Sequence, residues 1–144
     1  MEKILVSACL LGKPCRYDGK GKPYERIEAL KTKYELIPVC PENLGGLLTP
    51  RPPAEIKSGR VINKEGVDVT EEYTLGALET LKLAKEHNIT LAILKERSPS
   101  CGKGKVYDGS FSKTLIDGNG ITAELLIKNG ITILGESEIE NLIK

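Results

Sequence analysis

Three cysteines each follow an apolar run of strand length. Cys9 comes after Ile4-Leu5-Val6, Cys40 closes the run Leu36-Ile37-Pro38-Val39, and Cys101 comes shortly after Leu91-Ala92-Ile93-Leu94. Such runs predict buried strands, and open α/β sheets bind their ligands beyond the carboxyl ends of the strands. If the three strands are parallel neighbours, three thiols that are distant in the sequence converge on one crevice.

Thiolates are soft ligands that select zinc, copper(I) or iron-sulfur clusters. The spacing of Cys9, Cys15, Cys40 and Cys101 matches neither the paired short knuckles of zinc sites nor the clustered run of a bacterial ferredoxin. The local sequence therefore does not choose the metal. Three thiolates would leave one iron of a four-iron cluster free to act as a Lewis acid. Cys15 as a fourth ligand would close that position and favour electron transfer; a sulfur relay and a structural thiol are its other interpretations.

The composition narrows the class of partner. The 144 residues suit one domain, residues 1–144, and 21 basic against 20 acidic residues leave a net charge of +1. This balance favours a small molecule over nucleic acid or an anionic membrane, and the absence of Trp with only 4% aromatic residues disfavours a base-stacking surface for nucleic acid. Oligomeric state stays open.

The cellular compartment is predicted from the first residues and the cysteines. The apolar run after Met1 is too short for a signal sequence, and no stretch reaches the length of a membrane span. We therefore expect a cytoplasmic protein, in which thiols stay reduced. The cysteines then indicate metal binding or redox chemistry rather than disulfides.

Strands and helices alternate in the segments that must position these thiols. Strands are predicted at about 3–8, before Cys40, at 91–94 and at 131–134, and helices at about 24–33, 71–86, 121–128 and 137–143. The alternation predicts an α/β, three-layer Rossmann-like fold with a mostly parallel sheet of about four strands. In the longest helix, leucines 75, 78 and 81 with Ala84 predict an apolar stripe that lies on the sheet.

The connecting segments carry strong turn signals. Residues 41–53 contain four prolines and a Gly pair, which predict a rigid active-site loop. Residues 55–63 predict a small hairpin that turns at Ser58-Gly59. The polar, Gly-rich stretch 102–120 predicts a functional loop. Asp68 or Thr70 is the predicted cap of the longest helix, and Ser137 that of the last.

Six short motifs follow one another along the chain. They are Ser-Ala-Cys-Leu-Leu-Gly from Ser7, Cys-Arg-Tyr-Asp-Gly from Cys15, Pro-Val-Cys-Pro-Glu from Pro38, Pro-Arg-Pro-Pro-Ala-Glu from Pro50, Ser-Pro-Ser-Cys-Gly from Ser98 and Tyr-Asp-Gly from Tyr107. In this order they resemble the thiouracil desulfurase family over nearly the whole chain. The resemblance implies an enzyme that removes sulfur from a thiolated nucleobase such as thiouracil and releases sulfide. It also implies a [4Fe-4S] cluster held by Cys9, Cys40 and Cys101. The departure is Lys113, which stands where the resemblance predicts a glycine.

The implied hydrolysis needs residues that move a proton and bind the substrate. Glu42, two residues beyond Cys40, is the first catalytic candidate, because a carboxylate on a dry loop can have a raised pKa. Capping the following turn is its structural alternative. Ser100 is the second catalytic candidate. The predicted substrate contacts are Ser98, Arg51, Asp18 and Cys15.

These candidates also have structural interpretations. Ser98 and Ser100 flank a proline and could be turn residues, and Asp18 precedes Gly19, where a turn is expected. Arg51 could lock its loop by pairing with Glu55. Each residue therefore has two predicted roles that the structure can separate.

Two other functions fit the same cysteines. A non-catalytic iron-sulfur carrier or sensor would have four protein ligands and no substrate cavity, and a zinc or thiol enzyme would contain no cluster. Iron, sulfide and zinc analysis of protein purified without oxygen separates the last from the cluster proteins. Sulfide release from thiouracil separates the enzyme from the carrier.

Overall fold

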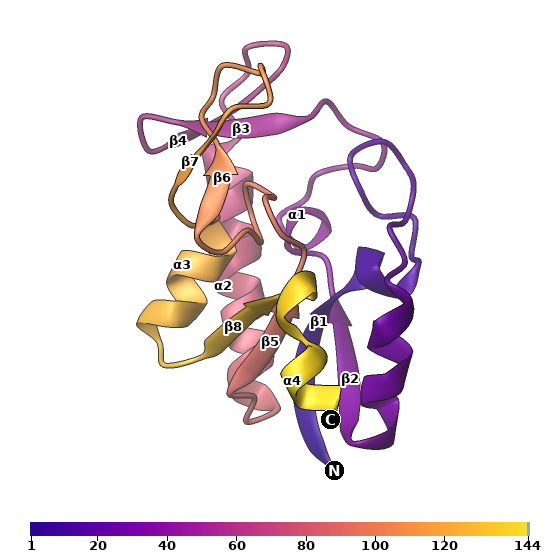
Figure 1. Ribbon diagram of the computed structural model, residues 1–144. Coiled ribbons are helices and arrows are strands. Elements are labelled where there is room, and N and C mark those ends of the chain that lie inside the picture. Colours follow the sequence, from indigo (N-terminus) through magenta and orange to yellow (C-terminus); the bar gives the residue numbers. More distant parts are fainter. Residues whose placement is uncertain (144) are drawn as a thin grey trace.

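Four parallel strands form the central sheet of the computed structural model, which describes residues 1–143 (Figure 1). They are β1 (Glu2–Ser7), β2 (Tyr34–Val39), β5 (Leu91–Leu94) and β8 (Thr132–Gly135). Their order across the sheet is β2-β1-β5-β8, and each neighbouring pair is parallel. The chain runs from β1 outward to β2 and then to the other side, so the order reverses between β1 and β5. The predicted α/β fold with a parallel sheet is confirmed.

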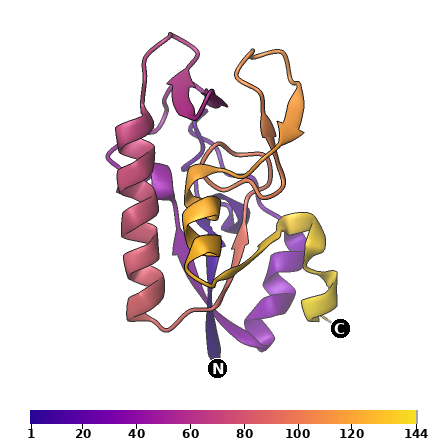
Figure 2. The ribbon, with the colours of Figure 1, turned by 90° about the vertical axis from the view of Figure 1, so that its left-hand side faces the viewer.

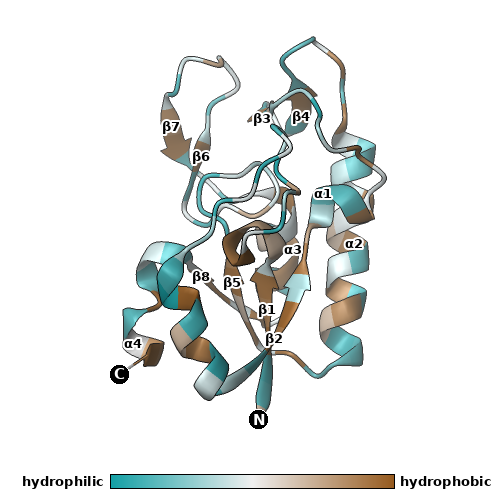
Figure 3. Cartoon of the chain, turned by 90° about the vertical axis from the view of Figure 1, so that its right-hand side faces the viewer, coloured by the Kyte–Doolittle hydropathy of each residue, from teal (hydrophilic) through white to brown (hydrophobic). Residues whose placement is uncertain are grey.

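Helices cover both faces of the sheet and complete three layers (Figure 2). Helices α2 (Thr70–Glu86) and α3 (Ile121–Lys128) pack on one face. The 3₁₀ helix η2 (Glu25–Thr32) and α4 (Glu140–Ile143) pack on the other. Successive strand residues point to opposite faces, so the core on the α2 side contains Leu5, whereas Ile4 and Val6 belong to the core on the η2 side. Figure 3 shows these apolar strands in the centre of the fold.

The leucine stripe predicted for α2 is wrong at its first two positions. Leu75 and Leu78 are 48% and 52% exposed. The side of α2 that is buried carries mostly small residues: Tyr73, Gly76, Ala77, Thr80 and Ala84. A helix turns once in 3.6 residues, so residues at every third position drift around its surface. The small residues let neighbouring backbone come close, which the leucines would prevent.

Two β-hairpins stand above the carboxyl ends of the sheet strands (Figure 1). The first joins β3 (Ala54–Lys57) to β4 (Arg60–Asn63). It turns at Ser58-Gly59 as predicted, with φ values of 51° and 79° that suit a two-residue hairpin turn. The second joins β6 (Lys105–Tyr107) to β7 (Leu115–Asp117). It lies within the stretch 102–120, which was predicted as a functional loop without strands, so the loop prediction is corrected to a hairpin.

The remaining elements are short. They are η1 (Ala8–Leu11), α1 (Pro41–Leu44) and η3 (Glu136–Glu138). The helix predicted at 24–33 is a 3₁₀ helix, and Ser137 lies inside η3, where its hydroxyl donates to Glu96, instead of capping α4. Val69 occupies the cap position of α2, but the carboxylate of Asp68 still accepts the Thr70 amide. Among the described residues, no helix is long and apolar enough to cross a membrane.

Candidate active site

The carboxyl edge of the sheet carries the cysteines. Cys9 lies in η1 directly after β1, Cys40 directly follows β2, and Cys101 follows β5 after a short loop. All three line one cavity of about 450 Å³, and Cys15 lines it as well. The cavity lies beyond the point at which the strand order reverses, where ligands bind in open α/β sheets. The predicted convergence of the thiols is therefore confirmed, while their role as ligands stays a prediction.

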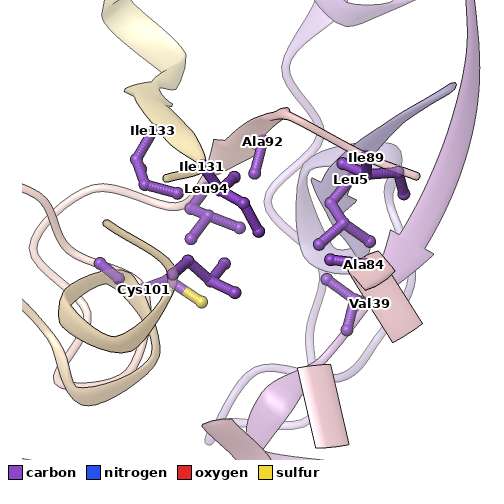
Figure 4. Packing of buried hydrophobic residues seen from close by; sticks show 11 residues of the cluster. Leu5, Val39, Ala84, Ile89, Ala92, Leu94, Cys101, Ile131 and Ile133 are labelled. Atoms are coloured by element: carbon purple, nitrogen blue, oxygen red, sulfur yellow. The ribbon is translucent and has the colours of Figure 1, made fainter. Parts of the chain in front are cut away.

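The four thiols differ in their exposure. Cys9 and Cys101 are 7% and 4% exposed, and Cys101 packs against the core beside Leu94 (Figure 4). Cys15 and Cys40 are partly exposed, and all four are free thiols. The thiol of Cys15 contacts those of Cys40 and Cys9, and the Cys40 thiol donates to the Cys15 carbonyl at 3.7 Å. Cys15 thus lies between two of the predicted ligands.

The protonation of these thiols depends on their surroundings. Burial, and then the charge of Glu42, raise the pKa of Cys101, while hydrogen bonds from Ser7 and Ser100 oppose this change. The hydrogen bond with Cys15 and burial raise the pKa of Cys40. The hydrogen bond with Cys40 lowers the pKa of Cys15. The contact with Cys9, burial and the charge of Glu42 together outweigh it, so this pKa is raised overall. A metal centre takes thiolates, so its binding here must release protons.

The donor set fits an iron-sulfur cluster. Among residues 1–143, no three Cys, His, Asp or Glu side chains are arranged to hold one metal ion. In a four-iron cluster each protein thiolate binds a different iron, so the ligands lie around the cluster and need not meet at one point. Cys9, Cys40 and Cys101 enter one cavity from separate chain segments, which suits such a group.

Glu42 lies in α1, on the cavity wall beside the cysteines. Its carboxylate Oε2 lies 3.4 Å from Nη2 of Arg51, and the two side chains are only 13% and 7% exposed. Burial raises the pKa of Glu42, and the guanidinium of Arg51 opposes the rise. A buried carboxylate with a raised pKa on a cavity wall is a candidate for exchanging a proton with a bound water. The hydroxyl of Tyr73 contacts Arg51 and lies on the same wall.

Arg51 joins three segments around the cavity. Its Nη1 donates to the carbonyl of Cys15 at 3.2 Å and to that of Leu48 at 3.2 Å. Its backbone amide donates to the Tyr17 carbonyl at 2.7 Å. The predicted alternative partner, Glu55, binds elsewhere, so the pairing of Arg51 with Glu55 is wrong. Arg51 instead fixes the Cys15 loop and Glu42 relative to one another.

Close packing of its backbone against α2 fixes the position of α1. A side chain on Gly76 of α2 would collide with the Pro41 carbonyl, and one on Gly45 would collide with the Glu72 carbonyl. The two glycines therefore let α1 lie directly against α2, and Pro41 suits the first turn, where its missing N–H costs nothing. Glu42 is held by backbone packing on one side and by Arg51 on the other.

The two serines of the Ser98-Pro99-Ser100 segment have different surroundings. Ser98 lines the cavity, and its Oγ accepts the amides of Ser100 and Cys101, each at 3.1 Å. Ser100 is fully buried, and its Oγ lies 2.8 Å from Thr122 Oγ1. Among the described residues that line the cavity, Ser100 is absent. Its predicted catalytic contact is corrected: its buried hydroxyl contacts Thr122 and hydrogen-bonds the Cys101 sulfur.

The predicted substrate contact of Asp18 is also corrected. Its carboxylate accepts the Lys20 amide at 3.0 Å and lies 3.6 Å from Arg16. Among the described cavity residues Asp18 is not found, although Arg16 and Tyr17 are. A short polar side chain before glycine satisfies its own turn, so the structural interpretation of Asp18 holds.

Four aromatic residues on the cavity wall were missed by the sequence interpretation. They are Tyr17, Tyr73, Tyr107 and Phe111. The chain has only five Tyr and one Phe, so four of its six aromatic residues line this cavity. The repeated Tyr-Asp-Gly at Tyr17 and Tyr107 was a signal that could have found two of them. An aromatic wall suits a flat heterocycle.

Comparison with known proteins adds three findings. A family model described as 2-thiouracil desulfurase matches residues 4–138. The protein named "Uncharacterized protein YbbK" of Bacillus subtilis (strain 168) is 44% identical over 150 aligned residues, which cover 97% of this chain and 99% of the relative. A solved structure described as the [4Fe-4S]-dependent thiouracil desulfidase TudS is similar with a TM-score of 0.92 and 44% identity, covering 99% of this chain and 95% of that one.

Proposed function

Because the chain belongs to the 2-thiouracil desulfurase family, we propose that it is a [4Fe-4S]-dependent enzyme that hydrolyses a thiolated nucleobase such as thiouracil and releases sulfide. One observation carries the proposal. Thiols from the ends of three neighbouring strands enter a single cavity, whose wall also holds a buried carboxylate and four aromatic side chains. This combination provides ligands for a cluster, a proton acceptor and room for a flat ring.

We assign the cluster to Cys9, Cys40 and Cys101. Bound by three protein thiolates, a [4Fe-4S] cluster supplies a Lewis-acidic iron with an open position for sulfur. Ser7 and Ser100 donate hydrogen bonds to the Cys101 sulfur, and Thr122 holds Ser100 in place. Such outer contacts orient a ligand and adjust the electron density on its sulfur.

We assign the proton transfer to Glu42. Its raised pKa suits a group that takes a proton from water and returns it to the ring or to the departing sulfur. Arg51 holds the carboxylate on the cavity wall. Because Ser98 Oγ already accepts two amides, its own proton is left to donate to a substrate heteroatom. Arg51 and Cys15 complete the wall on the substrate side.

The oxidation states of the reactants decide whether Cys15 can act as a sulfur relay. Replacement of C=S by C=O with water releases sulfur as sulfide, so carbon and sulfur keep their oxidation states. A sulfur relay through a Cys15 persulfide would need the loss of two electrons to an oxidant that the hydrolysis does not supply. We therefore propose that Cys15 contacts the substrate as a neutral thiol.

The scope of the proposal follows from composition. Residues 1–144 act as one domain on a small thionucleobase rather than on nucleic acid, because a net charge of +1 provides no field for a polyanion. We place the enzyme in the cytoplasm, where its thiols stay reduced.

A single-turnover and steady-state assay tests the proposal. Protein reconstituted with iron and sulfide without oxygen is incubated with thiouracil in ¹⁸O-labelled water, and uracil and sulfide are quantified. We expect equal amounts of uracil and sulfide, with one labelled oxygen in uracil. Glu42→Gln should retain the cluster and lose most of the turnover. Cluster-loaded protein that releases no sulfide, or protein that binds zinc in place of iron, would refute the proposed function.

A further inference from the structure

The turn of the β6–β7 hairpin reaches the cavity. Phe111 and Lys113 line it from this turn and Tyr107 from the end of β6, and Glu55 lines it from β3 of the neighbouring hairpin. Gly109 lies so close to β3 that a side chain there would meet the Lys57 side chain and the Ile56 carbonyl. The two hairpins therefore cover the cavity as one unit.

One carboxylate joins the two hairpins. Glu55 Oε1 accepts the amide of Gly109 at 3.0 Å and the amide of Phe111 at 3.1 Å. Hydrogen bonds from backbone amides to a charged carboxylate are stronger than neutral ones. The single oxygen thus fixes two amides that lie two residues apart, on either side of Ser110.

The turn has an unusual backbone. Gly109, Phe111 and Lys113 have φ values of 95°, 57° and 62°. Positive φ is uncommon for residues other than glycine and costs free energy at Phe111 and Lys113. Strained residues persist where the surroundings hold them, and they gather at ligand sites. Glu55 provides that restraint at Phe111, whose ring lies on the cavity wall.

We propose that Phe111 is the residue that selects an aromatic thiocarbonyl substrate by covering the face of its ring, and that Glu55 is the positioning residue that holds Phe111 there. The inference rests on the proposed function and adds the residue by which the enzyme would prefer an aromatic substrate ring. The backbone that carries the phenyl ring is held in place, since Glu55 accepts the amides of Gly109 and Phe111. A fixed aromatic face favours a planar base over a puckered one, because only the planar ring keeps full contact.

The test compares two substrates and five variants, of which Glu55→Gln is the conservative rescue. Cluster-loaded wild type, Phe111→Ala, Phe111→Leu and Glu55→Ala are assayed for sulfide release from 2-thiouracil and from its saturated 5,6-dihydro derivative. Glu65→Gln is the control, because Glu65 is an exposed carboxylate in the loop after β4. We expect KM for 2-thiouracil to rise about tenfold in Phe111→Ala, with a smaller change for the dihydro compound. Glu65→Gln should match wild type.

Glu55 acts through Phe111, so it needs its own readout. Hydrogen exchange at the amides of Gly109 and Phe111 should speed up at least tenfold in Glu55→Ala, while core amides of β1 do not change. Glu55→Gln keeps an acceptor oxygen and should rescue part of both the exchange protection and KM. Both Glu55 variants should retain kcat and iron content near the wild-type values.

The outcomes separate the two proposals. If wild type releases no sulfide from 2-thiouracil, the proposed function fails. If wild type is active and Phe111→Ala leaves both KM values within twofold, or raises them equally, Phe111 does not select the ring. If Glu55→Ala raises KM without faster exchange at Gly109 and Phe111, Glu55 does not position the turn.

Discussion

The cavity has a floor and a roof that are built in different ways. The floor, the carboxyl ends of β1, β2 and β5 with the residues that follow them, is backed by two buried cores and carries the four thiols. The roof, the hairpins 54–63 and 105–117, consists of strands of three or four residues joined through Glu55. The floor can hold a reactive group in place, while the roof presents a fixed aromatic residue, Phe111, that can select among substrates by their shape. The difference predicts that floor substitutions abolish chemistry and that roof substitutions alter selection.

The largest expected effect is the loss of a floor ligand. Cys101→Ser replaces a soft thiolate with a hydroxyl, so iron and sulfide content should fall to background and desulfuration should disappear. Cys15→Ser changes the thiol that we exclude from the ligand set, so this variant should retain iron and lose activity by about tenfold. Iron and sulfide analysis with a visible spectrum measures both. Full iron in Cys101→Ser, or its loss in Cys15→Ser, would contradict the assignment of ligands.

Arg51 provides the next largest effect. In Arg51→Met the carboxylate of Glu42 stays buried without its cation, so the pKa of Glu42, already raised by burial, rises further. At a given pH less of the base is ionised, and the acidic limb of the kcat profile should move to higher pH. We expect kcat at pH 7 to fall by about 100-fold, the lower end of what a general base contributes.

Arg51→Lys is the matched control for charge. Lysine keeps the cation near Glu42 but cannot bind Glu42 and the carbonyl of Cys15 with one planar group. Its pH profile should lie between those of wild type and Arg51→Met. A profile that is unchanged in both variants, in protein with full iron content, would remove Arg51 from the proton transfer.

The floor could be predicted from the sequence because each thiol follows a local signal. An apolar run followed by a cysteine marks a strand end, and alternation with helices makes the strands parallel, so the meeting of Cys9, Cys40 and Cys101 follows without long-range information. Glu42 was found in the same way, two residues after Cys40. Which serine faces the cavity was not predictable, since the direction of Ser98 and Ser100 depends on the turn between them.

The roof could be predicted only in part. The Ser58-Gly59 turn has a local signature, but strands as short as β6 and β7 leave little pattern in a Gly-rich segment. The partner of Glu55 could not be found, because the Phe111 amide is 56 residues away and the bond depends on a left-handed backbone. Lys113, the departure from the expected glycine, proved to have positive φ, the conformation that favours glycine.

Packing beneath the floor should have a moderate effect on stability. Gly76→Ala would push the new methyl group into the Pro41 carbonyl, so α1 or α2 must move, which costs about 1–3 kcal/mol of unfolding free energy. Leu78→Ala introduces the same residue on the exposed side of α2 and should change that free energy by less than about 0.5 kcal/mol. Chemical denaturation of both variants measures the difference. Equal values would show that α2 does not depend on close contact with α1.

The smallest expected effect tests the strain in the roof. Glycine adopts positive φ freely, so Lys113→Gly removes a strain of about 1 kcal/mol, against which its greater freedom in the unfolded chain costs about 0.5–1 kcal/mol. Ser112→Gly, at the neighbouring position without positive φ, relieves no strain, incurs the same cost in the unfolded chain and also loses the hydroxyl contacts with Ser110 and Thr114. Denaturation should therefore find Lys113→Gly equal to wild type or slightly more stable, and Ser112→Gly less stable. If both glycines destabilise the protein equally, the left-handed backbone at Lys113 is not under strain, and the roof would resemble the floor in being held by relaxed local geometry.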